Sequence, residues 1–245
     1  VLSGFILCLP FAHYHIGNGK KVQLKHYYLR RVTRLEPPYF IALTGIFMLQ
    51  VLFRTRSFSE MWPNWLASMG YAHMVVFHTI PSITIVTWSL EIEIQFYLLA
   101  PLLFNVLSFD KFTRRLSLLI AIIGIILLQN FFPLAIISLC DYAQFFCIGI
   151  LLADFYVTDD LAPLFRKKWM VPVAVISLFV LLYLPIKSET PDFYTLLWAR
   201  LCFPFTIFVF CYAVFKNALL IKAFSYRFVP IIGGMCYSIY LLHYT

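Results

Sequence analysis

The 245-residue chain is 62% hydrophobic and only 12% charged, whereas soluble domains carry about 25% charged residues. With a mean hydropathy of +0.86, this composition excludes a soluble globular domain and indicates a polytopic membrane protein. The net charge of +8 does not indicate nucleic-acid binding. The basic residues fall in short loops between apolar stretches, where such residues set topology and contact lipid headgroups.

A helix that spans a membrane needs roughly 20 apolar residues. On that basis the sequence predicts an all-α bundle of transmembrane helices in one domain, residues 1–245, with eight clear spans or part-spans and one doubtful segment. In chain order these are Val1–Ala12, Pro38–Phe53, Asn64–Thr79, Ser82–Phe109, Leu116–Phe132, Leu134–Val157, Trp169–Pro185, Phe193–Phe215 and Val229–Thr245.

Two features of this prediction stay open. Asn64–Thr79 is small and polar for a span, so a re-entrant or interfacial segment is an alternative, and the side on which later basic loops lie depends on it. The chain also begins without methionine inside one apolar run and stops inside another. We therefore expect a domain that lacks its first helix and is truncated at the C-terminus as well.

Three arginines, Arg30, Arg31 and Arg34, precede the pair Pro37-Pro38. On a helix they stand three or four residues apart and can share one face. They anchor the start of a span, or they clamp the phosphates of a cytoplasmic donor such as a nucleotide or coenzyme A, because guanidinium groups match phosphate oxygens. We expect the proline pair to end the arginine helix and begin the next span, because proline fits a first helical turn.

Two carboxylates, Glu91 and Glu93, interrupt the apolar segment Trp88–Pro101. A charged side chain at the bilayer centre costs at least about 2.5 kcal/mol, so each glutamate is expected to be paired or to do chemistry. Residues two apart on a helix point about 200° apart, which excludes a carboxylate dyad. One face would line a polar cavity and the other would pair with a basic side chain, for which Arg200 is the candidate.

The remaining polar residues give weaker signals. Single interfacial histidines are normally satisfied amphipathic residues, and no histidine pair has metal-binding spacing, so no metal is expected. We interpret Asp141 and Asp154 as caps at headgroup level. The absence of a glycine-rich phosphate loop and of a nucleophile elbow disfavours a P-loop pump and a serine hydrolase.

Four motifs then occur in order: Val1-Leu-Ser-Gly-Phe5, the arginine segment Tyr28–Tyr39, Trp88-Ser-Leu-Glu-Ile-Glu-Ile-Gln-Phe-Tyr97, and Tyr237-Ser-Ile-Tyr-Leu-Leu-His243. In this order and spacing, the chain resembles acyltransferase family 3, the bacterial integral-membrane O-acyltransferases that modify surface sugars. The resemblance covers essentially the whole chain.

The resemblance implies transfer of an acyl group, often acetyl, from acyl-coenzyme A to a sugar hydroxyl of a polysaccharide, lipopolysaccharide or other glycan. The expected partners are acyl-coenzyme A as donor substrate, a glycan or lipid-linked sugar as acceptor, and membrane lipids, with no bound cofactor and no nucleic acid. The expected location is the bacterial cytoplasmic (inner) membrane.

The family pattern also selects residues. Its glutamate falls on Glu93, whereas Glu91 occupies a variable position. Arg31 and Arg34, with Arg30, would bind the donor, and a histidine thought to be the general base would precede Val1 in the family. The residues expected to shape the site are Ser3, Trp88, Ser89, Tyr97 and His243.

Two rival functions remain. A secondary transporter or flippase would use an intramembrane carboxylate without chemistry. Against it, the sequence shows no inverted repeat and no matching pair of broken helices. A catalytically inactive sensor that keeps the fold is the third possibility.

Overall fold

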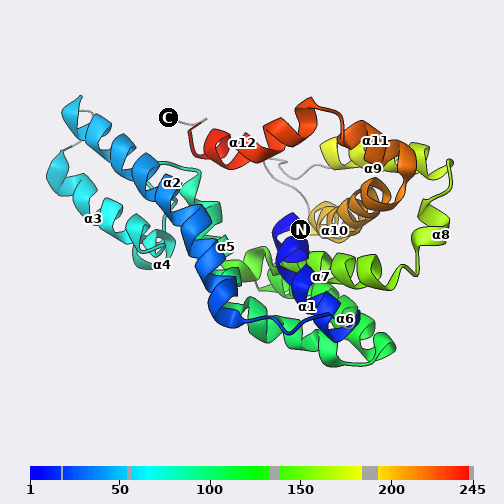
Figure 1. The fold of residues 1–245 in the computed structure, drawn as a ribbon. Helices are drawn as coiled ribbons and strands as arrows, with labels where there is room; N and C mark the ends of the chain where they lie inside the picture. The colour runs from blue at the N-terminus through cyan, green and yellow to red at the C-terminus, as the bar shows by residue number, and fades with distance from the viewer. Residues whose placement is uncertain (18, 54–56, 133–137, 184–192, 243–245) are drawn as a thin grey trace. The chain divides into compact units, whose positions relative to one another are not determined.

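A computed structural model describes residues 1–17, 19–53, 57–132, 138–183 and 193–242 (Figure 1). Within these ranges the chain forms twelve α-helices and two short 3-10 helices, with no strand. The predicted all-α fold is therefore confirmed. The chain divides into two compact units, each described separately below.

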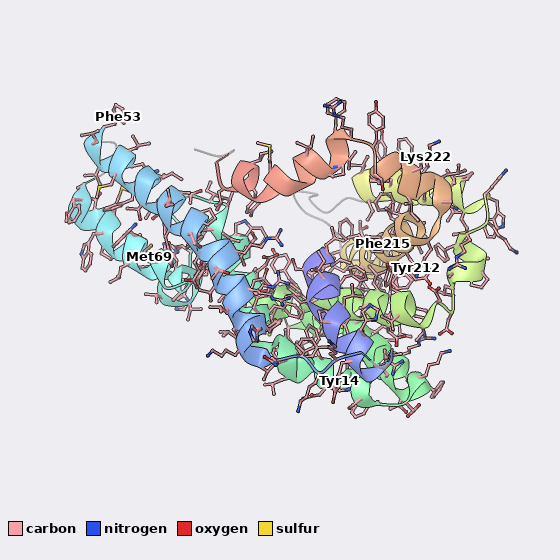
Figure 2. All side chains as sticks on the ribbon, viewed as in Figure 1. Tyr14, Phe53, Met69, Tyr212, Phe215 and Lys222 are labelled. Carbon is pink, nitrogen blue, oxygen red and sulfur yellow. The ribbon has the colours of Figure 1, made fainter. Side chains whose placement is uncertain are left out.

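The first unit comprises Val1–Val22, Ala100–Leu134 and Cys140–Pro230. In its core, α1 packs along α7 through glycines, and the Phe5 ring stacks on Phe215, with ring centroids 4.8 Å apart. Figure 2 labels Phe215 and Tyr212 on α10. Its helices are α1 (Leu2–His15), α6 (Lys111–Phe131), α7 (Ala143–Thr158), α8 (Ala162–Phe165), α9 (Met170–Tyr183), α10 (Phe193–Lys216) and α11 (Ala218–Phe224). The 3-10 helix η1 (Phe104–Ser108) also belongs to this unit. Of the 3-10 helix η2 (Leu139–Asp141), all but Leu139 belongs to it.

The second unit comprises Gln23–Leu99, Ala135–Leu139 and Ile231–Thr245. It contains α2 (Leu24–Leu52), α3 (Phe58–Met69), α4 (His73–Phe77), most of α5 (Thr87–Leu103) and most of α12 (Phe228–Leu242). In Figure 1, α3 lies beside the C-terminal half of α2. The buried residues that hold this unit together are Tyr39, Leu43, Ile46, Phe47, Met61, Ile83, Leu90 and Leu241.

Within the part of the chain that the structure describes, four helical stretches are long and apolar enough to cross a membrane: Leu24–Leu52, Thr87–Ser108, Lys111–Phe131 and Tyr194–Lys216. A bent pair formed by α11 and the first half of α12 makes a fifth if it counts as one span. Apolar side chains project outward from them; Ile41 and Leu52 on α2 are 74% and 75% exposed, as expected of a surface solvated by lipid. These features indicate an integral membrane protein.

The expected eight or nine membrane segments are not confirmed. The helices α1, α7 and α9 have 14, 16 and 14 residues, which is short of a full span. The doubtful segment Asn64–Thr79 is not one helix. It contains the end of α3, a tight turn and the five-residue α4.

The prediction that Pro37-Pro38 ends one helix and begins another is wrong. A single helix, α2, runs through both prolines for 29 residues. The prolines remove two backbone N–H donors. Continuing the helix buries Tyr39, Leu43 and Phe47, which recur every four residues on one face, and the Tyr39 hydroxyl donates to the Ser68 carbonyl over 2.7 Å. This packing outweighs the lost backbone hydrogen bonds.

The interpretation of Asp154 as a cap at headgroup level is also wrong. Asp154 lies inside α7 and is fully buried, and its carboxylate pairs with Arg114 and Arg115 from α6, each at 2.5 Å. The two arginines that look like topology signals in the sequence therefore join two helices. Breaking a buried ion pair of this kind typically costs about 3–5 kcal/mol.

Candidate functional site

Glu93 lies on the face of α5 that carries Ser89 and Tyr97, one turn to either side. Glu93 is partly buried, and the Tyr97 hydroxyl donates to its Oε2 atom over 2.6 Å. A short hydrogen bond from a hydroxyl to a carboxylate is strong and fixes the orientation of the acceptor. Glu93 is thus held as an oriented hydrogen-bond acceptor.

Arg31 brings a positive charge to the same place from α2. Its guanidinium carbon lies 5.8 Å from the centroid of the Tyr97 ring, within the range of a cation–π interaction. Arg31, Tyr97 and Glu93 therefore form a continuous series from a cation through an aromatic ring to a carboxylate. The structure brings together three of the residues predicted for the site.

A backbone feature of α5 explains why α2 lies against it here. Pro101 has no N–H to donate to the carbonyl of Tyr97 four residues earlier. The hydroxyl of Tyr27, on α2, donates to that carbonyl over 3.3 Å. Tyr28 makes the equivalent bond to the Leu98 carbonyl, also over 3.3 Å. Consecutive tyrosines thus attach α2 to α5 one turn before Arg31.

A closely packed gap, too narrow to hold a water molecule, lies beside the carboxylate, and we call it the Glu93 crevice. Apart from Glu93, the residues around it are aliphatic or aromatic. A carboxylate in such surroundings forms strong hydrogen bonds, because little water competes, and here the donor is the Tyr97 hydroxyl. The lining residues are Leu35, Tyr71, Leu90, Glu93, Ile94 and Tyr97.

Ser89 joins α5 to the last helix. Its hydroxyl lies 2.6 Å from the hydroxyl of Tyr240 on α12, and Tyr240 also donates to the Val86 carbonyl over 2.8 Å. With the Tyr240 proton directed to Val86, Ser89 is the donor in the hydroxyl pair. The start of α5 is therefore fixed by hydrogen bonds on the same face as Glu93.

The other predicted site residues are placed less closely. Arg30 and Arg34 are exposed on α2, and neither forms an ion pair or hydrogen bond with the described residues. Trp88 is partly buried at the start of α5 and does not line the Glu93 crevice. Ser3 lies in α1, in the first unit, and His243 falls outside the described residues.

Glu91 occupies the opposite face of α5 and is fully buried. Its Oε2 atom accepts a hydrogen bond from the backbone amide of Met74 over 3.0 Å. Arg200 belongs to the first unit, where its guanidinium donates to Asn130 Oδ1 over 2.9 Å, and its suggested salt bridge with Glu91 stays a prediction. Glu91 and Glu93 thus lie on opposite faces of α5, as the helical spacing predicts, and the partner of Glu91 is a backbone amide.

The chain is similar in sequence to known acyltransferases. The family described as "Acyltransferase domain" matches residues 1–245. The chain belongs to this acyltransferase family. It is 26% identical over 273 residues to the peptidoglycan O-acetyltransferase OatA of Listeria monocytogenes, and 24% identical over 270 residues to the O-acetyltransferase OatA of Staphylococcus aureus.

Both alignments cover 100% of the chain but only 43% and 44% of the relatives, so the acyltransferase domain spans less than half the length of these proteins. No solved structure matches the chain significantly. Family membership shows that the residues described above, Glu93 among them, belong to an acyltransferase domain.

Sequence reasoning missed three residues of this acyltransferase domain. Leu35 and Tyr71 line the Glu93 crevice, and Tyr240 bonds to Ser89. Tyr240 lies inside a motif that the sequence had already singled out, three residues before His243. Leu35 lies four residues after Arg31, so the helical period places both on the same face of α2. Nothing in the sequence around Tyr71 indicates its position.

Proposed function

We propose that this chain is the membrane domain of an O-acyltransferase, one that moves an acyl group, most simply acetyl, from acyl-coenzyme A to a hydroxyl of a cell-surface glycan. The proposed location is the bacterial cytoplasmic membrane. The arrangement of Arg31, Tyr97 and Glu93 is the observation that supports the proposal most, because a cation suited to an anionic donor lies close to an oriented carboxylate. Family membership and the acetyl-transferring relatives support it.

Acyl transfer to a hydroxyl needs a base that removes the hydroxyl proton and donors that stabilise the oxyanion of the tetrahedral intermediate. In the proposed reaction, Glu93 accepts a hydrogen bond from the basic group, which the family resemblance suggests is a histidine, and stabilises the cation that forms. This is the role of the carboxylate in a catalytic triad. The hydrogen bond from Tyr97 fixes the carboxylate for this purpose.

The arginines of α2 would bind the donor. Arg30 and Arg34 are exposed and have no partner among the described residues, so binding a phosphate breaks no existing ion pair. Arg31 is already held at Tyr97 and would mark the end of the donor site nearest to the chemistry. Guanidinium groups bind phosphate oxygens with two parallel hydrogen bonds, which suits the several phosphates of coenzyme A.

The proposal is tested with the full-length protein reconstituted in liposomes, with radiolabelled acetyl-coenzyme A and peptidoglycan glycan strands. Glu93→Gln is expected to reduce transfer of label by a factor of about 100 or more, as expected for loss of a charged catalytic group. Arg34→Ala is expected to raise KM for the donor about tenfold with little change in kcat, because it removes binding alone.

Matched controls are available on the same chain. Glu60→Gln and Lys222→Ala change exposed residues on α3 and α11 and are expected to leave transfer unchanged. Near-normal acylation by both Glu93→Gln and Arg34→Ala would overturn the assignment. Movement of a substrate across the liposome membrane without label transfer would instead identify a transporter or flippase.

A further inference from the structure

Glu91 is the buried carboxylate that the proposed reaction does not use. It lies on the opposite face of α5 from Glu93, with 0% of its surface exposed. Among the described residues no cation forms an ion pair with it, and its Oε1 atom has no hydrogen-bond partner. Its Oε2 atom accepts from the Met74 amide over 3.0 Å. Burying a carboxylate costs free energy, so we expect Glu91 to have a structural or functional role that offsets this cost.

The helix α4 supplies a structural reason. The first amides of any α-helix have no partner within the helix and are usually satisfied by the side chain of the N-cap residue. The N-cap residue of α4 is Ala72, which has no acceptor in its side chain. Glu91 takes over this role from a neighbouring helix, and its negative charge suits the positive end of a helix.

The turn before α4 is strained, because Tyr71 has a φ of 53°, in the left-handed region that aromatic residues rarely adopt. Two backbone hydrogen bonds hold it: the Tyr71 amide donates to Ser68 over 3.0 Å and the Ala72 amide donates to Ala67 over 2.9 Å. The Tyr71 ring stacks on Tyr39 at 4.7 Å. Strain of this kind persists only where neighbours determine the conformation.

A second buried contact attaches α4 to α3. His73 is fully buried, and its Nε2 atom lies 2.9 Å from Oδ1 of Asn64. Asn64 donates its own amide to the Glu60 carbonyl, so its Oδ1 is the acceptor and His73 is the donor. Burial lowers the pKa of His73, which favours the neutral ring in this role. α4 is thus held from α3 at His73 and from α5 at Met74.

Tyr71 connects this structure to the site because it also lines the Glu93 crevice. Its position depends on α4 immediately after it, and α4 depends on Glu91. We propose that Glu91 is a positioning residue for acyl transfer: by capping α4 from the back of α5, it holds Tyr71 against the Glu93 crevice. This inference rests on the proposed function.

Another residue on the same face supports the interpretation. Gln95 follows Glu91 by one turn, and its Oε1 atom accepts from the Leu139 amide over 2.9 Å. Glu91 and Gln95 thus each bind the backbone of a segment that is distant in sequence. The back face of α5 thus binds two short helical segments, α4 and η2, whereas its front face carries Glu93.

Two substitutions of Glu91 separate the effect of its side-chain length from the effect of its charge. Glu91→Gln keeps the length of the side chain and the acceptor for Met74 and removes the charge. Glu91→Asp keeps the charge but is one methylene shorter, so it does not reach the Met74 amide. With the full-length protein in liposomes and radiolabelled acetyl-coenzyme A, Glu91→Gln is expected to stay within about threefold of wild type. Glu91→Asp is expected to lose about tenfold to a hundredfold in kcat, with KM for the donor unchanged.

Hydrogen exchange of peptides covering residues 71–78 provides a readout that does not depend on activity. Glu91→Asp is expected to speed exchange there about tenfold, and Glu91→Gln to leave it unchanged. A merely structural role would change exchange without changing kcat, and would overturn the inference. The inference is also overturned by the opposite order of activities, with Glu91→Asp active and Glu91→Gln inactive, because this would assign Glu91 a role through its charge.

The proposed function and the inference fail differently. A wild-type protein that transfers no label from acetyl-coenzyme A overturns the proposed function. Unchanged exchange of residues 71–78 in Glu91→Asp overturns the inference, whatever the transfer assay shows. Tyr71→Ala is the partner variant: if Glu91 acts through Tyr71, then Tyr71→Ala and the double variant Glu91→Asp/Tyr71→Ala have equal kcat values.

Discussion

The hydroxyl of Tyr97 donates to the carboxylate of Glu93 over 2.6 Å, one helical turn away on α5. Because the two residues belong to the same helix, their relative positions do not depend on the packing of other segments. We therefore expect this pair to be present throughout the proposed reaction cycle. Removing the Tyr97 hydroxyl therefore changes the hydrogen bonding of Glu93 while the glutamate itself stays in place.

The first prediction is that Tyr97→Phe reduces acyl transfer about tenfold to a hundredfold, since a hydrogen bond to a charged group contributes about 1.5–3 kcal/mol. The ring stays in place, so the contact with Arg31 and KM for the donor are expected to remain. Transfer of radiolabelled acetyl measures the change. Tyr28→Phe is the control, because among the described residues the only hydrogen bond of its hydroxyl goes to the Leu98 carbonyl. Equal activity of Tyr97→Phe and wild type would show that Glu93 does not need this bond.

The second prediction concerns the attachment of α2 to α5. Tyr27→Phe leaves the Tyr97 carbonyl without a partner, because Pro101 offers no N–H. An unsatisfied buried carbonyl costs about 1–3 kcal/mol. The thermal unfolding midpoint in detergent is therefore expected to fall.

The matched rescue uses the same carbonyl. In Tyr27→Phe/Pro101→Ala, the backbone amide that alanine restores at position 101 can donate to the Tyr97 carbonyl within the helix, so the unfolding midpoint is expected to return most of the way to wild type. Tyr28→Phe is expected to change little, since the Leu98 carbonyl keeps the Leu102 amide as its helical partner. A double variant that is as unstable as Tyr27→Phe would contradict this explanation.

Much of the site was predictable because its residues are close in sequence. Glu93, Tyr97 and Ser89 recur every four residues, so the helical period alone places them on one face of α5. Arg31 required more than this, because its place beside Tyr97 depends on which part of α2 packs against α5. The family motifs suggested that Arg31 and Glu93 belong to one site, and the structure shows the contact between Arg31 and the Tyr97 ring.

The predictions that were wrong or incomplete share one physical cause: the residues involved interact with partners that are distant in sequence. The sequence shows that Glu91 needs a partner, but not that the partner is the amide of Met74, because backbone amides are present everywhere in a chain. Asp154 and its arginines are separated by about 40 residues and only the packing of α6 on α7 joins them. Local rules likewise predicted a break at Pro37-Pro38, where tertiary packing keeps α2 continuous.

The third prediction follows from the charge cluster after α7. The hydrogen bond from Lys111 is the main cause that lowers the pKa of Asp160 from 3.8 to about 2, and Arg115 adds to it. A carboxyl with a lowered pKa stabilises the fold above its unfolded pKa and loses this contribution as the pH falls through its folded pKa. Asp160 is therefore expected to contribute fully above about pH 5 and to lose its contribution between about pH 4 and pH 2.

The measurement compares thermal unfolding midpoints of wild type and Asp160→Asn across this range. The difference between the two proteins is expected to be constant from pH 5 to pH 7 and to shrink toward pH 2, while the other carboxyls cancel because both proteins contain them. A difference that grows on acidification would contradict the assigned direction of the pKa shift.

The last prediction concerns the contact between α1 and α7 in the first unit. A Cβ atom on Gly149 would lie 2.7 Å from the Phe5 amide nitrogen and closer still to the Val1 carbonyl, both of them backbone atoms of α1 and its cap. Gly4 on the opposite helix is similarly confined, with a Cβ distance of 2.7 Å to the Phe146 carbonyl. Backbone atoms cannot rotate away, so Gly149→Ala must separate the two helices.

We expect Gly149→Ala to destabilise the domain by about 1–3 kcal/mol, the usual cost of an overpacked contact. Gly124→Ala is the control. It lies inside α6, where a Cβ atom would meet nothing within 4 Å, and replacing a helical glycine by alanine typically stabilises by about 0.5–1 kcal/mol. The two variants make the same chemical change and should shift the thermal unfolding midpoint in opposite directions. Equal shifts would mean that α1 does not pack on Gly149 as closely as the structure shows.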